Sequence, residues 1–128
     1  MRILVIEDNR ALRDITARLL ASHGYEVLVA DGGGEGLRLW REHGADLVLT
    51  DIHMGDMSGI DVVREIRATL PSLPVVVMSG SSNADDLKLL RAIAQPGSVG
   101  LLMKPFLRDQ LFATVDRELQ GGPPAGQP

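Results

Sequence analysis

Five side chains that can bind a metal ion or a phosphate group stand at the ends of four apolar runs. Glu7 and Asp8 follow the first run, Asp51 follows the third, Ser79 ends the fourth and Lys104 follows the fifth. Carboxylates bind hard cations through oxygen, while ammonium and hydroxyl groups donate hydrogen bonds to phosphate oxygens. The set indicates metal-assisted phosphate chemistry, provided that the fold brings the five residues together.

The apolar runs are short and rich in β-branched residues, which favours strands. Most are nearly continuous rather than alternating, as is typical of parallel strands buried on both faces. The predicted strands are Arg2 to Ile6, Tyr25 to Ala30, Asp46 to Thr50, Pro74 to Ser79 and Val99 to Met103.

Segments with a helical period alternate with these strands. Gly24 and Gly44 stand where helix C-terminal caps are expected, and Ser58 and Asn83 stand where N-terminal caps are expected, each with an aspartate three residues later. Strands that alternate with helices predict a mainly parallel sheet with right-handed crossovers. The fold class is therefore α/β, a (βα)5 doubly wound parallel sheet of five strands.

Ligands of such a sheet bind beyond the carboxyl ends of its strands, where the strand order reverses. We infer the order 2-1-3-4-5, which makes strands one and three neighbours and brings Glu7, Asp8 and Asp51 together. Two unit charges ~4 Å apart repel by roughly 4 kcal/mol at an effective dielectric of 20. Protonation of one acid would relieve this repulsion, but an open crevice favours a hard cation, and Mg2+ fits an oxygen donor set.

The same residues also have purely structural interpretations. Asp8 or Asn9 is a candidate cap of the first helix, Asp51 a candidate cap of a turn, and Ser79 a candidate satisfied core hydroxyl. The joint occurrence of the acids with a lysine and a hydroxyl at one sheet edge favours the functional interpretation.

Composition limits the function further. The chain has 128 residues, no cysteine and a net charge of -4, which excludes disulfides and thiolate sites and disfavours binding to nucleic acid or to an anionic membrane. We expect a cytoplasmic protein with one domain over residues 1–120. Residues 121–128 are rich in glycine and proline and are expected to form a disordered tail or the start of a linker.

Four sequence runs, ILVIEDN, LVLTDIHMGDMSG, PVVVMSG and GLLMKPF, closely resemble the receiver domain of two-component response regulators. The resemblance extends from Arg2 to about Leu119. It implies the flavodoxin-like receiver fold and a signalling role in a phosphorelay, in which the domain is not an enzyme beyond its own phosphorylation and dephosphorylation. It also implies a cis peptide bond between Lys104 and Pro105.

By this resemblance, Asp51 is the phosphoacceptor. Mg2+ would be bound by Asp8, by Asp51 and by the backbone carbonyl of His53, with Glu7 acting through water. Lys104 would pair with the phosphoryl oxygens.

Ser79 would donate its hydroxyl to the phosphoryl group and pull the loop from Gly80 to Asn83 with it. The implied phosphoryl donor is a sensor histidine kinase or a phosphotransfer protein, docked on the first helix near Arg10, Leu12 and Arg13. The fourth helix, fifth strand and fifth helix would then bind a downstream protein or a fused output domain, without direct contact with nucleic acid or a membrane.

The chain departs from the family pattern at two positions. Gly55 replaces the usual proline after the phosphoacceptor, so a looser loop is expected. Leu101 replaces the switch aromatic, which puts the usual hydroxyl-to-ring coupling in doubt. By the resemblance, His53 and Ser81 occupy the two positions that in the family tune the lifetime of the acyl phosphate, although an exposed loop residue is the simpler interpretation of the His53 ring.

Other features have plain structural interpretations. Gly32, Gly33, Gly34 and Gly36 lack the lysine and hydroxyl of a phosphate-binding loop, and Met57 is expected to pack within its loop.

Two alternative functions remain. A small Mg2+ phosphohydrolase with an aspartate nucleophile is one, but it would usually need an acid where His53 stands. A degenerate receiver that only docks is the other, and it is disfavoured because all five expected groups are present. The chain is either a stand-alone regulator or the receiver part of a longer protein.

Overall fold

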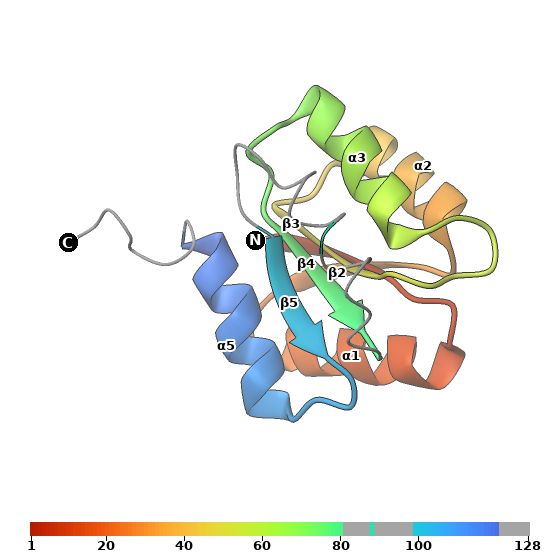
Figure 1. Cartoon of the computed structure of the whole chain (residues 1–128). Coiled ribbons are helices and arrows are strands. Elements are labelled where there is room, and N and C mark those ends of the chain that lie inside the picture. Colours follow the sequence, from red (N-terminus) through yellow and green to blue (C-terminus); the bar gives the residue numbers. More distant parts are fainter. Residues whose placement is uncertain (81–87, 89–98, 121–128) are drawn as a thin grey trace.

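The computed structural model describes residues 1–80, 88 and 99–120 (Figure 1). Five strands and four helices have defined bounds in these residues: β1 (Arg2–Ile6), α1 (Arg10–Ser22), β2 (Glu26–Ala30), α2 (Gly33–His43), β3 (Leu47–Asp51), α3 (Gly59–Thr69), β4 (Val75–Ser79), β5 (Val99–Met103) and α5 (Arg108–Leu119). The predicted fourth helix with its Asn83 cap, the loop from Gly80 to Asn83 beyond its first residue, and the predicted tail 121–128 lie outside the described residues.

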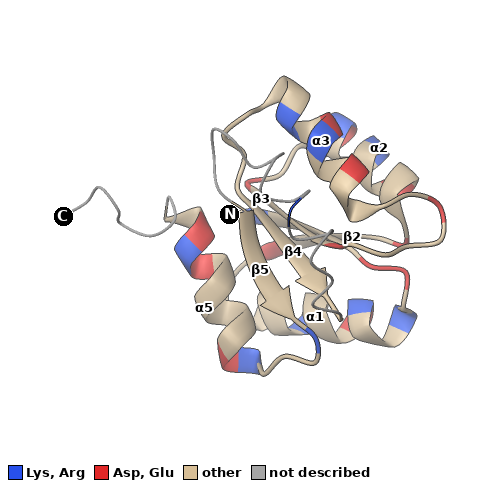
Figure 2. Cartoon of the chain, viewed as in Figure 1, with Lys and Arg blue, Asp and Glu red and all other residues tan. Residues whose placement is uncertain are grey.

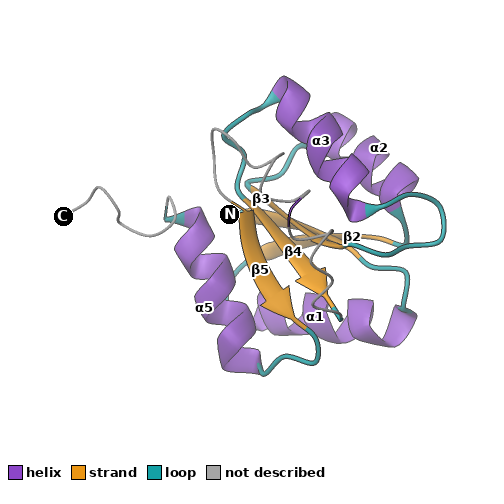
Figure 3. Ribbon diagram, viewed as in Figure 1, coloured by secondary structure: helices purple, strands orange, loops and turns teal. Residues whose placement is uncertain are grey.

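The strands form one parallel sheet in the order β2-β1-β3-β4-β5, which confirms the predicted order. β1 lies between β2 and β3, with Leu4 opposite Leu28 on one side and Val48 on the other. Helices cover both faces of the sheet, α1 and α5 on one and α2 and α3 on the other (Figures 1 and 3). The strand order therefore places the β1 and β3 carboxyl ends next to each other.

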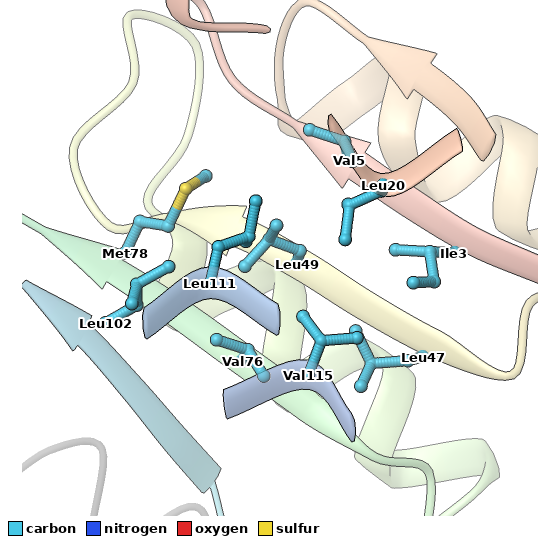
Figure 4. Close-up of a cluster of buried hydrophobic side chains, with 10 residues drawn as sticks. All are labelled: Ile3, Val5, Leu20, Leu47, Leu49, Val76, Met78, Leu102, Leu111 and Val115. Carbon is cyan, nitrogen blue, oxygen red and sulfur yellow. The ribbon is translucent and has the colours of Figure 1, made fainter. Parts of the chain in front are cut away.

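Side-chain alternation along the strands explains the two apolar layers. Ile3 and Val5 of β1 pack with Leu20 of α1 and with Leu111 and Val115 of α5 (Figure 4). The intervening strand residues point to the opposite face and form a second buried cluster with α2 and α3, containing Leu4, Ile6, Ala30, Leu37, Val48, Val62, Ile66 and Leu73. Continuous apolar runs in the sequence thus reflect strands buried on both faces.

The two edge strands are more exposed than predicted. In β5, Leu101 and Met103 are exposed while Gly100 and Leu102 are buried, and in β2 Glu26 and Val29 are exposed. Every residue is buried only in β3 and β4, and in the third central strand, β1, only the first residue, Arg2, is partly exposed. Figure 2 shows the strands mostly free of charge, with charged residues on helices and loops.

Helix and strand ends follow the predicted caps, with small shifts in bounds. Asn9 and Ser58 accept hydrogen bonds from backbone amides at the starts of α1 and α3, and Gly24 and Gly44 have positive φ after α1 and α2. Strands β2, β3 and β4 each begin one residue later than predicted, and β3 ends at Asp51 rather than before it. No helix in the described part of the chain is both long and apolar enough to cross a membrane.

Candidate functional site

Three carboxylates meet at the carboxyl edge of the sheet. Because β1 and β3 pair with Ile6 opposite Thr50, the residues that follow, Glu7 and Asp51, lie beside each other. One oxygen from each of Glu7, Asp8 and Asp51 lies within 4.8 Å of the others. Glu7 is 1% exposed and Asp51 6% exposed, whereas Asp8 faces solvent. The cluster therefore has a buried base and an open side.

Lys104, which follows the edge strand β5, also reaches the cluster. Its Nζ lies 2.8 Å from Oε1 of Glu7 and 3.1 Å from Oδ2 of Asp51. The backbone N–H of Lys104 donates to the carbonyl of Ser79 at 2.8 Å, and the Lys104–Pro105 peptide bond is cis, as the family resemblance implies. The ammonium group thus bridges the two buried acids.

Burial and charge act in opposition on these groups. Burial raises the pKa of Glu7, and it outweighs the hydrogen bonds from Lys104 and the Asn9 amide that lower it. Burial acts to lower the pKa of Lys104, but the hydrogen bonds to Glu7 and Asp51 prevail, and the pKa of Lys104 is raised. The lysine is therefore held in its charged form beside the acids.

The turn between β1 and α1 is fixed by side chains of the same segment. Asn9 caps α1 through its Oδ1, which accepts from the Leu12 amide at 3.0 Å. Its own N–H donates to Oε2 of Glu7 at 3.0 Å, and Nη1 of Arg13 donates to the Glu7 carbonyl at 3.1 Å. The capping interpretation thus holds for Asn9, and Asp8 is left exposed at the cluster.

The loop after Asp51 turns back tightly on the strand. The Ile52 amide donates to the Met78 carbonyl at 3.1 Å, and the Gly59 amide donates to the Ile52 carbonyl at 2.7 Å. A Cβ at Gly59 would overlap the backbone carbonyl of Asp51, so this return requires glycine. His53 lies in the loop and is exposed, two residues from Asp51.

Ser79 is the last residue of β4 and is 1% exposed. In the sheet register it pairs with Met103, next to Lys104. The structure therefore brings Ser79 to the same edge as Glu7, Asp8, Asp51 and Lys104.

Sequence reasoning missed Asp56. Its carboxylate accepts hydrogen bonds from the amides of Gly33 at 3.0 Å and Gly34 at 2.8 Å, at the start of α2. The N-cap residue Gly32 makes no side-chain cap. The sequence contains no clear signal for this contact, because Asp31 directly precedes the glycines and is itself a candidate cap. The structure places the N-cap at Gly32 instead, so the acceptor must come from another segment.

The donor set fits a divalent cation. With all groups ionised, three carboxylates and one ammonium leave a net charge of -2 at the cluster. All the side-chain donors are hard oxygens, which suits Mg2+. Exposed Asp8 leaves the cluster accessible, so the residues present are compatible with the predicted metal.

An apolar groove of about 420 Å³ adjoins the site. It runs between α1 and the segment after β5 and is lined by Leu12, Ile15, Leu19, Lys104, Pro105 and Phe106. Ile15 is 56% exposed. The apolar surface therefore reaches the lysine of the acidic cluster.

Comparisons with known proteins agree with this geometry. A family model described as response regulator receiver domain matches residues 3–116. The cell cycle transcriptional regulator CtrA of Caulobacter vibrioides is 36% identical over 115 residues, which cover 90% of this chain and 48% of CtrA. The transcriptional regulatory protein GlrR of Escherichia coli K12 is 32% identical over 96% of this chain and 27% of GlrR.

A solved structure shows the same fold. The CheY-like response regulator receiver domain protein of Methanospirillum hungatei superposes with a TM-score of 0.86 at 27% identity, over 93% of each chain. The present chain spans about half the length of CtrA and about a quarter of GlrR.

Proposed function

The chain belongs to the response regulator receiver domain family, and on that basis we propose that Asp51 accepts a phosphoryl group from a phosphohistidine. The observation that carries the proposal is the position of Asp51: it ends the buried strand β3, lies 3.1 Å from Nζ of Lys104 and shares a cluster with Glu7 and Asp8. The donor would be a sensor histidine kinase or a phosphotransfer protein.

In the proposed reaction, a carboxylate oxygen of Asp51 attacks phosphorus. The new O–P bond forms as the P–N bond to the donor imidazole breaks, and the imidazole nitrogen keeps that electron pair and takes up a proton. No redox partner is required. The product is an aspartyl phosphate, and the added charge falls where Lys104 already holds an ammonium group.

Mg2+ is the proposed metal, held by Asp8, Asp51 and the His53 carbonyl, with Glu7 acting through water. When bound, the ion would neutralise negative charge on the acids and on the phosphoryl oxygens. The net charge of the cluster and its oxygen donors support this assignment.

The switch would start at Ser79. We propose that its hydroxyl donates to the phosphoryl group once Asp51 is modified, and that this shifts the population of two loop arrangements. Its place at the end of β4, paired with Met103, supports the assignment. Leu101 is 38% exposed on β5, so the output surface would offer an aliphatic contact where other receivers have a ring.

The groove beside α1 is the proposed docking place of the phosphoryl donor. Leu12 and Ile15 give it an apolar floor, and Lys104 closes it on the side of Asp51. An amphipathic helix that carries the phosphohistidine would bury its apolar face here and bring the phosphoryl group to the cluster.

The remaining finer assignments extend this proposal. The domain would comprise residues 1–120, act in the cytoplasm as a signalling module with no catalysis beyond its own phosphorylation and dephosphorylation, and pass its state to a downstream protein or a fused output domain. The family match over residues 3–116 supports the domain assignment.

The test is incubation with acetyl phosphate and Mg2+ followed by intact mass measurement. Wild type is expected to gain one phosphoryl group, and Asp51→Asn none. Asp61→Asn, which removes an exposed acid paired with Arg64, serves as the control and should behave as wild type. An adduct on Asp51→Asn of wild-type yield would refute the proposal.

A further inference from the structure

The first turn of α2 depends on a side chain from a different segment. α2 opens with Gly33 and Gly34 after the N-cap Gly32, which supplies no side-chain cap. Unpaired amides at a helix start require acceptors. The carboxylate of Asp56 accepts both the Gly33 and Gly34 bonds, and it lies 22 residues further along the chain than Gly34.

Two physical effects strengthen this contact. The hydrogen bonds from Gly34 and Gly33 lower the pKa of Asp56, so the carboxylate stays charged, and a negative group at a helix N-terminus is stabilised by the helix dipole. An apolar contact lies beside it, since a Cβ at Gly33 would overlap Cγ of Met57 and lie 2.8 Å from its Sδ. Glycine at 33 therefore admits Met57, next to Asp56.

Asp56 and Met57 belong to the segment that follows Asp51. We define residues 52–58 as the acceptor loop. Its two ends are fixed, because the Ile52 amide bonds to Met78 and the Gly59 amide bonds to Ile52. The contact between Asp56 and α2 adds a third point of attachment, between these two ends, in the second half of the loop.

Within the loop, Gly55 contributes no side chain to packing, and a Cβ there would meet nothing within 4 Å. The hydrogen bonds that Asp56 accepts from Gly33 and Gly34 restrain the chain one residue beyond Gly55 and three residues beyond His53.

We propose that Asp56 is a positioning residue for the reaction: by clamping the acceptor loop to the first turn of α2, it holds the backbone around His53 in place to bind a divalent cation with Asp8 and Asp51. The inference rests on the proposed function for the role of the His53 carbonyl. Outer groups that orient metal ligands typically contribute 10–100-fold to metal affinity, and the lower end of that range is expected for an exposed clamp.

The experiment compares Asp56→Ala and Asp56→Asn with Asp61→Ala, which also removes one exposed acid, from the first turn of α3. Titration calorimetry measures the Mg2+ affinity of each protein, and NMR measures hydrogen exchange at the Gly33 and Gly34 amides without metal. Asp56→Ala should weaken Mg2+ binding about tenfold and speed exchange at both amides. Asp56→Asn keeps one acceptor oxygen and should fall between Ala and wild type, and Asp61→Ala should match wild type.

Equal Mg2+ affinities for Asp56→Ala and Asp61→Ala would overturn the inference, as would unchanged exchange at Gly33 and Gly34. A wild type that binds Mg2+ with the predicted Asp56 dependence but gains no phosphoryl group from acetyl phosphate would refute the proposed function and support the clamp. The native circular dichroism spectrum of each variant is the check that a weaker affinity reflects loop position rather than unfolding.

Discussion

The acidic site is held in two different ways on its two sides. On the side of β1, charge fixes the residues: Glu7 is almost fully buried, bonded to Lys104 and to the Asn9 amide. On the side of β3, the acceptor loop is exposed at His53 and Gly55, and Asp56 fastens it to α2. Buried Glu7 is thus paired with Lys104 inside the cluster, whereas the segment expected to supply a carbonyl ligand is held by a contact outside the cluster.

This difference has a physical basis. A buried carboxylate is tolerated only when a partner compensates for the lost hydration, and Lys104 is that partner for Glu7 and Asp51. The acceptor loop lies beside the proposed phosphoacceptor and would have to admit the donor, so it cannot be buried in the same way. The bonds between Asp56 and the first turn of α2 hold the acceptor loop in position and leave the site open.

Removal of Lys104 should have the largest effect. Lys104→Met keeps an unbranched side chain one atom shorter but removes the charge that faces Asp51, so phosphoryl uptake from acetyl phosphate should slow about 100-fold, as for the loss of one preorganised donor. Lys88, the other lysine of the chain, is exposed, so Lys88→Met is the matched control. The rate of phosphorylation is measured by intact mass over time. Equal rates for the two variants would contradict the role of the Lys104 charge beside Asp51.

A methyl group added at Gly33 should have the next largest effect. Its Cβ would overlap Met57, and overpacking of this kind costs about 1–3 kcal/mol. Gly34→Ala is the control, because its Cβ would meet only the end of the Asp56 side chain at 3.3 Å. Urea unfolding should show Gly33→Ala less stable by about 2 kcal/mol; a Gly33→Ala protein as stable as Gly34→Ala would show that the loop does not depend on this contact.

The contribution of Asp56 to stability should depend on pH. Its pKa lies below the ordinary 3.8 because the Gly34 and Gly33 amides bond to the charged form, so its stabilisation is present above that value and is lost as pH falls through the lower folded-state pKa. Near neutral pH, Asp56→Asn keeps one acceptor oxygen but removes the negative charge at the start of α2, which should cost about 0.3–1 kcal/mol.

The difference between Asp56→Asn and wild type should therefore shrink in urea unfolding experiments as pH falls below 3.8 and through the lower folded-state pKa. A difference that stays constant, or grows, over this range would mean that the carboxylate charge is not what holds the loop.

A substitution at Gly55 should have the smallest effect and the opposite sign. Nothing lies within 4 Å of a Cβ there, and the φ of Gly55 is not positive, so Gly55→Ala mainly reduces the freedom of the unfolded chain. We expect a gain of about 0.5 kcal/mol in thermal unfolding. A loss of stability would show that Gly55 has a packing or backbone role.

The sequence was sufficient to predict the sheet and most of the site, because both depend on local signals. Continuous apolar runs mark buried strands, and parallel strands bring their carboxyl ends to one edge, which places Glu7, Asp8, Asp51, Ser79 and Lys104 together. The exposure of Leu101 and of Val29 was not predicted, since composition does not distinguish an edge strand from a central one.

Asp56 could not be assigned from local signals, because its partners are 22 and 23 residues away in sequence. In the sequence, Asp31 is the nearer candidate for a cap of α2, and only the structure shows that the helix begins after Gly32 and takes its acceptor from Asp56. The position of the Lys104 ammonium group between Glu7 and Asp51 could not be predicted either. It depends on the conformation of a long side chain, which the strand order does not determine.

The most direct test of the account locates the phosphoryl group. Protein treated with acetyl phosphate and Mg2+ is reduced with borohydride, which converts an aspartyl phosphate to homoserine, and the peptides are sequenced by mass spectrometry. Homoserine is expected at position 51 and at no other acid. Homoserine at position 8, where the exposed carboxylate of the same cluster stands, would contradict the assignment of Asp51 as phosphoacceptor.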